Sequence, residues 1–133
     1  MCDVLCYNDF VRLKELQKQF LEYLEVEKNR SVKTVENYDR YLRRFLKLTG
    51  AATPSDITAE LVRNYRLKLN RIRDRAGKEL KRQTQFYHLI ALRSFLKYLA
   101  KRDITSLVPE KVELGKMPAR SIEFMESDEL SRL

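Results

Sequence analysis

Glycine and proline are scarce in this chain, and their scarcity limits the fold. The 133 residues contain only three of each, which leaves few of the turns that an all-β protein needs between its strands. Tryptophan is absent and histidine occurs once. The two cysteines, Cys2 and Cys6, lie so close together that they cannot cross-link distant parts of a fold, and we expect reduced thiols in a cytoplasmic protein. These scarcities favour an all-α fold.

Long apolar runs and catalytic motifs are lacking too. No stretch approaches the roughly 20 apolar residues of a membrane span, and no signal peptide is recognisable, so we expect no membrane partner. The sequence contains no glycine-rich phosphate loop, HExxH or GxSxG motif. His88 has no cysteine or carboxylate cluster at the spacing of a metal site or a triad. We therefore predict no catalytic residue, metal site or cofactor, and a binding module instead.

Charge is abundant and unevenly placed. The net charge is +8, but residues 28–102 alone carry +14, whereas residues 1–27 and 103–133 each carry −3. The basic residues are interleaved with apolar ones at helical spacing, so they belong to a folded surface rather than to a basic tail. Such a block favours a polyanionic partner, foremost nucleic acid.

Apolar periodicity predicts four helices, the first over residues 9–27, the second ending near Leu48, the third starting after Thr58, and the last over residues 82–101. Predicted N-caps are Asn8 or Asp9, Ser31 and Thr58, and Gly50 suits the left-handed residue that ends the second helix. Residues 74–81 are expected to form a basic turn.

The second and fourth helices each have two different faces. The expected buried stripe of the second helix is Val35, Tyr38, Leu42, Phe45 and Leu46, and that of the fourth helix is Leu89, Leu92, Phe95, Leu96 and Leu99. Hydrogen-bonding and basic side chains occupy another side. On the second helix they are Lys33, Thr34, Asn37, Arg40, Tyr41 and Arg44, and on the fourth they are Arg82, Gln83, Thr84, Tyr87 and His88, with Ala91 on the same side. A merely solvated face is an equally good interpretation of the second helix alone.

Helical periodicity ends after Asp103. Residues 104–126 contain two prolines and a glycine and are predicted to be an extended interdomain linker. Ser127, followed by Asp128 and Glu129, has the pattern of a new helix start. The predicted organisation is thus a domain over residues 9–103, a linker over 104–126 and the first residues of a further domain over 127–133.

Three stretches together resemble one family. FLEYLEVEKNRSVKTVENYDRYLRRFLKL resembles the start of the core-binding domain of tyrosine recombinases, the Xer and phage integrase family. YHLIALRSFLKYLAKRDI is similar to the last helix of that domain, and VPEKVELGKMPARSIEFMESDELSRL is similar to the linker and the first residues of the catalytic domain. The resemblance implies a four-helix SAM-like domain whose second and fourth helices face the major groove of double-stranded DNA, within a recombinase that also contacts other protomers.

The resemblance also assigns residues. The two polar strips described above match the family's DNA-facing positions, although the family often has arginine where this chain has Tyr87 and His88. The family's catalytic arginines, lysine, histidines and tyrosine nucleophile match no position of this sequence. The implied function is DNA binding in site-specific recombination or integration, whose chemistry in a complete recombinase passes through a phosphotyrosine bond. The alternative left open is a helical protein–protein module whose basic face binds an acidic partner.

Overall fold

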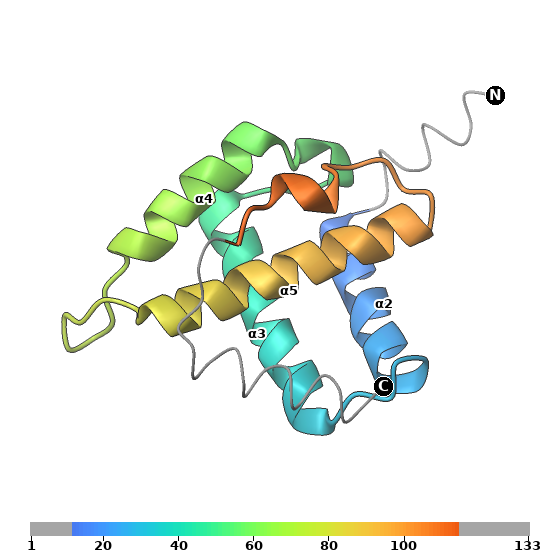
Figure 1. The fold of residues 1–133 in the computed structure, drawn as a ribbon, viewed down its shortest axis with the longest axis horizontal. Coiled ribbons are helices and arrows are strands. Elements are labelled where there is room, and N and C mark those ends of the chain that lie inside the picture. Colours follow the sequence, from blue (N-terminus) through green and yellow to red (C-terminus); the bar gives the residue numbers. More distant parts are fainter. Residues whose placement is uncertain (1–11, 115–133) are drawn as a thin grey trace.

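The computed structural model describes residues 12–114 and shows an all-helical arrangement (Figure 1). Its elements are α2 (Leu13–Val26), α3 (Val32–Thr49), the 3₁₀ turn η1 (Pro54–Asp56), α4 (Ala59–Arg71), α5 (Arg82–Lys101) and the 3₁₀ turn η2 (Pro109–Lys111). Within this range there is no strand beyond one isolated bridge between Arg73 and Glu79. Within residues 12–114 the prediction of an all-α fold with four helices is confirmed.

Both ends of α3 are fixed by the residues that the sequence indicated. The Ser31 hydroxyl accepts a hydrogen bond from the Thr34 backbone N–H at 3.2 Å, which satisfies a donor that the helix itself cannot pair. At the other end Gly50 adopts a left-handed conformation, with φ of 72°, and donates its N–H to the Leu46 carbonyl. A residue with a Cβ would be strained there, so the helix ends where glycine occurs.

The loop that follows α3 is held by one carboxylate. Asp56 accepts hydrogen bonds from the backbone N–H groups of Ala52 and Thr53, at 2.9 and 3.0 Å. These two bonds, with the Ala52 bond the stronger influence, lower the pKa of Asp56 below its ordinary value. Thr58 then caps α4 as predicted, since its hydroxyl accepts from the Leu61 N–H at 3.1 Å.

A tight turn joins α4 to α5, in agreement with the predicted basic turn. Arg73 and Glu79 face each other in the isolated bridge and form an ion pair of 2.7 Å. Between them the Asp74 carboxylate accepts from the Lys78 N–H, and Gly77 supplies a left-handed residue with φ of 81°. The turn reverses the chain so that α5 can pack back across the domain.

The core forms where α5 crosses α3, with α2 on one side and α4 on the other (Figure 1). Phe20 of α2 lies at the centre of an aromatic cluster, with its ring centroid 5.4 Å from that of Phe95 and 5.5 Å from that of Tyr98. Phe45 of α3 meets Tyr65 of α4 edge to face at 4.9 Å. Burying each such ring removes a large apolar surface from water and stabilises the fold by about 1.5–3 kcal/mol.

Residues 104–114 differ from the expected start of the linker, because they pack onto the helices. The Val112 side chain is only 1% exposed and belongs to the core. The Ser106 hydroxyl donates to the Pro54 carbonyl at 3.0 Å, and the Arg66 guanidinium donates to the Glu113 carbonyl. The packed body therefore extends at least to Val112 and does not end at Asp103, because the apolar side chains after α5 cover the α4–α5 side of the core.

Three predictions fall on residues that the structure does not describe. The candidate N-caps Asn8 and Asp9 lie outside residues 12–114. The helix expected from residue 9 begins at Leu13, with Arg12 in an extended conformation as its N-cap, so the expected start is wrong. The remaining part of the predicted linker, residues 115–126, and the helix start at Ser127 lie outside as well. These assignments stay predictions.

Candidate nucleic-acid interface

The first polar strip lies along α3 and remains accessible. Lys33 and Arg40 are exposed. The other members are half-buried, and they are Thr34, Asn37, Tyr41 and Arg44. Arg40 donates to the Asn37 side-chain oxygen at 2.6 Å, and its guanidinium carbon lies 5.8 Å from the centroid of the Tyr41 ring. The strip therefore presents the Arg40 guanidinium already oriented by neighbours on the same helix.

The second strip occupies the first two turns of α5. Arg82 and Gln83 are exposed, and Thr84 and Tyr87 are half-buried. The Gln83 amide donates to the Tyr87 hydroxyl at 2.9 Å, which leaves the Gln83 carbonyl oxygen and the Tyr87 O–H for a partner. This strip thus offers both donors and acceptors.

His88 joins the two strips. Its Nε2 lies 3.3 Å from Nη1 of Arg44 on α3, and its Nδ1 lies 2.7 Å from the Thr84 carbonyl oxygen on α5. The Tyr41 ring stacks at a tilt on the imidazole, with 4.4 Å between centroids. Residues 44 positions apart in the sequence are therefore in direct contact, which holds the two strips next to each other.

The exposure predicted for His88 is wrong, because the side chain is only 2% exposed. Ala91, expected on the same face, is completely buried. The reason is that α5 contacts α2, α3, α4 and η2, so a wider arc of its surface is covered than its leucine stripe indicates. His88 supports Arg44 from beneath and does not reach the surface itself.

The hydrogen bonds of His88 define its protonation. The Thr84 carbonyl can only accept, so Nδ1 carries the proton, and Nε2 then accepts from the Arg44 guanidinium. Burial lowers the pKa of His88 from 6.5 to about 4; the Thr84 bond opposes this shift, and the charges of Arg44 and Arg40 add to it. His88 is therefore a neutral acceptor at physiological pH, which suits the orientation of a cation.

Sequence patterns did not reveal one further donor set, the backbone N–H groups in the first turn of α5. The N-cap residue Lys81 makes no side-chain hydrogen bond to that turn. The positive end of the helix dipole and these N–H groups favour an anion at this position. The sequence does indicate these free N–H groups in one way: the N-cap residue of α5 is a lysine, whereas Ser, Thr, Asp or Asn is usual at that position.

Comparison with known proteins identifies the family. A sequence model described as "Phage integrase, N-terminal SAM-like domain" matches residues 18–103. The chain belongs to this family. The SAM-like domain thus covers most of α2, all of α3, α4 and α5, and both polar strips. The chain is a core-binding domain of the tyrosine recombinase family, which implies DNA binding.

The chain is also similar to part of longer curated relatives that are named tyrosine recombinase XerC. Tyrosine recombinase XerC of Pelotomaculum thermopropionicum is 33% identical, with 86% of this chain and 38% of the relative covered. The XerC proteins of Pelobacter propionicus and Listeria monocytogenes are 34% and 32% identical, with 81% and 90% of this chain covered. The chain covers only 34% and 39% of the length of these two relatives. No solved structure gives a significant match.

Two features are absent from the part of the chain that the structure describes. Between residues 12 and 114 no helix combines the length and the apolar character needed to cross a membrane. The same range contains no group of three His, Cys, Asp or Glu side chains that could hold a metal ion.

Proposed function

We propose that this core-binding domain holds one side of a DNA duplex against α3 and the first half of α5. The observation that carries the proposal is the contact of Arg44 with His88, because it unites the two polar strips in one basic surface. An isolated solvated face on α3 would need no such support from another helix.

The side chains of this surface suit two kinds of contact. Lys33, Arg40, Arg44 and Arg82 are cations that can neutralise phosphates, and the first turn of α5 adds backbone donors. Asn37 and Gln83 carry amides, the groups that pair with the acceptor and donor of adenine in the major groove. Phosphate contacts would supply most of the affinity and fix the register, and the two amides would add sequence preference.

The test is duplex binding across a salt series, measured by fluorescence anisotropy with the 133-residue chain. With about five phosphates neutralised, the logarithm of the affinity should fall against the logarithm of salt concentration with a slope of about −4 to −5. Arg40→Ala/Arg44→Ala removes two of these contacts, so the slope should become shallower by about 2.

The matched control is Lys97→Ala/Lys101→Ala. These exposed residues have the same spacing and total charge as the arginine pair on α3. They lie at the C-terminal end of α5, whereas the second polar strip lies at its N-terminal end. An equal effect of the two double substitutions would show that only net charge matters and would contradict the proposed surface. Binding that does not depend on salt would contradict it as well, and would favour the basic face as a site for an acidic protein.

The wider role belongs to the same proposal. In a complete recombinase this domain would position duplex DNA in the cytoplasm, beside other recombinase protomers, while another domain supplies the tyrosine that bonds to the DNA phosphate during recombination or integration. The relatives' names support this role, since each is a tyrosine recombinase.

A further inference from the structure

A second basic surface lies between α2 and α3 and takes no part in the proposed DNA contact. It is a groove of about 740 Å³ that continues to the residues after Gly50. Half-buried Leu21, Leu46 and Ala51 contribute its apolar lining. Its cationic lining residues are Arg12, Lys14, Lys18, Arg43 and Lys47. The groove is thus apolar in part and bordered by positive charge.

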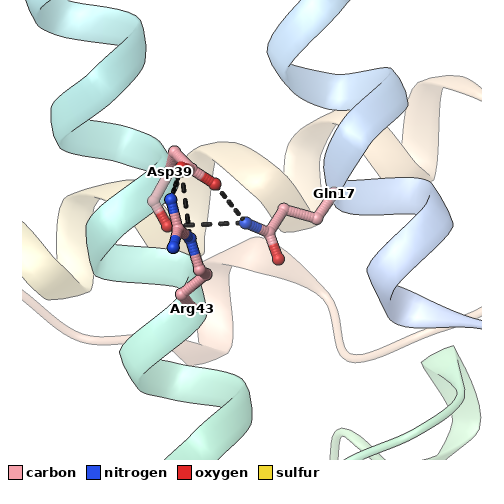
Figure 2. Close-up of polar contacts among 3 residues, drawn as sticks. All are labelled: Gln17, Asp39 and Arg43. Carbon is pink, nitrogen blue, oxygen red and sulfur yellow. Dashed lines mark hydrogen bonds and ion pairs between the residues drawn. The ribbon is translucent and has the colours of Figure 1, made fainter.

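The one carboxylate that lines the groove is already engaged. Asp39 accepts from the Gln17 side-chain amide at 2.8 Å and pairs with Arg43 (Figure 2). Gln17 comes from α2 and the other two residues from α3, so this contact also ties the two walls together. In residues 12–114 no carboxylate pairs with Arg12, Lys14, Lys18 or Lys47. The groove therefore keeps a strong excess of positive charge.

The groove faces away from the proposed DNA surface. At about 100° per residue, the α3 positions of Asp39, Arg43 and Leu46 lie about 150° around the helix from the centre of the first polar strip, whereas Lys47 lies about 20° from Arg40 at the edge of that strip. A straight duplex against that strip would leave the α2 side of the groove, with Lys14, Lys18 and Leu21, uncovered. Half-buried leucines would also gain little from phosphates, whereas apolar side chains of a peptide would bury them further.

We propose that this groove binds an acidic amphipathic helix of a partner protein. A groove between two packed helices can bind a third helix, whose apolar side chains enter the groove. Its carboxylates would then meet the four cations of the groove that no carboxylate of residues 12–114 pairs with, and this attraction would also accelerate encounter at low salt. Charge and apolar lining thus point to one kind of occupant.

The test uses the full 133-residue chain and a fluorescent synthetic peptide of about 15 residues, with leucines at helical spacing and glutamates elsewhere. We expect a dissociation constant below about 100 µM. Lys14→Glu/Lys18→Glu should weaken binding about tenfold or more, since two attractive ion pairs are lost and the reversed charges repel the peptide. Lys97→Glu/Lys101→Glu, exposed and equally spaced, should leave it within about twofold.

A second measurement locates the peptide independently of charge. On addition of the peptide, the amide NMR shifts of Gly50, Ala51 and Ala52, which line the groove, should change. A scrambled peptide of equal composition should not change these shifts. Absence of binding, equal losses in both double variants, or shifts confined to α5 would overturn the proposal.

Two other occupants would also overturn it. If Lys14→Ala/Lys18→Ala, which removes the same charge as Arg40→Ala/Arg44→Ala, weakens duplex binding as much, the groove belongs to the nucleic-acid surface. If sedimentation shows a dimer that this variant dissociates, the occupant is a second copy of the chain. Because the peptide assay contains no DNA, its failure leaves the proposed DNA contact standing, and the reverse also holds.

Discussion

His88, which contacts Arg44 of α3 from its position on α5, makes the free energy of unfolding depend on pH. The unfolded chain takes up a proton with the ordinary pKa of 6.5, whereas the folded chain resists protonation until about pH 4. The unfolded state therefore binds more protons between these values, and the free energy of unfolding falls as the pH falls through this window. The maximal slope for one group is about 1.4 kcal/mol per pH unit.

His88→Gln should remove this contribution while keeping an acceptor for Arg44, since the glutamine carbonyl can take the place of Nε2. Between about pH 7 and about pH 5 the wild type should lose about 2 kcal/mol more than the variant in urea unfolding. Asp56, whose pKa is lowered, is present in both proteins and cancels in the difference. Identical pH profiles would show that folding does not change the pKa of His88.

Tyr65 carries a hydroxyl that the fold does not use. The side chain is fully buried, and its hydroxyl has no hydrogen-bond partner among the described residues. Burial also raises the pKa of Tyr65. Tyr65→Phe should therefore leave the free energy of unfolding unchanged or raise it by up to about 1 kcal/mol, measured by urea denaturation.

Tyr98→Phe is the matched control. Tyr98 is also buried, but its hydroxyl accepts from Arg102 at 2.5 Å, so its loss should lower the free energy of unfolding by about 1 kcal/mol. A clear destabilisation by Tyr65→Phe would reveal a partner for the hydroxyl, such as a buried water.

At the scale of elements, Asp39 fixes α2 against α3. Asp39→Ala leaves the buried Gln17 amide without its side-chain acceptor and should lower the free energy of unfolding by about 1–3 kcal/mol. Asp39→Asn keeps the oxygen that accepts from Gln17 and should cost much less. Thermal or urea unfolding measures both.

The control for charge is Glu36→Ala, an exposed acidic position on the same helix. Equal effects of Asp39→Ala and Asp39→Asn would mean that the attraction of the carboxylate to Arg43 matters more than the Gln17 hydrogen bond.

The elements differ in how far the sequence predicted them. Helix ends at Ser31, Gly50 and Thr58 were predictable because capping depends on local geometry. The burial of His88 was not, because it depends on which elements surround α5, and the helical period of one segment carries no such information. The Arg44–His88 contact was missed for the same reason, although both residues were expected in the site.

At the scale of the whole molecule, the segment after α5 decides where the domain ends. Val112→Ala should lower the free energy of unfolding by about 1–2 kcal/mol because it opens a cavity in the core. Val108→Ala makes the same chemical change at a side chain that is 51% exposed, and its effect should stay within about 0.5 kcal/mol. Urea unfolding of both variants measures the difference.

Equal, small effects at the two valines would contradict the packing of residues 104–114 and would restore the boundary at Asp103. The sequence could not predict this packing, because prolines and lost periodicity indicate only that regular helix ends. Whether the chain then leaves the body or folds back depends on an apolar surface that other helices create.

The folded-back segment also shortens the reach of the chain. If residues 115–126 are a linker as predicted, a following domain is tethered by 12 residues rather than by the 23 of residues 104–126. The maximum span then falls from about 80 Å to about 40 Å. A shorter tether confines the second domain to a smaller volume and raises its local concentration at DNA already held by the first.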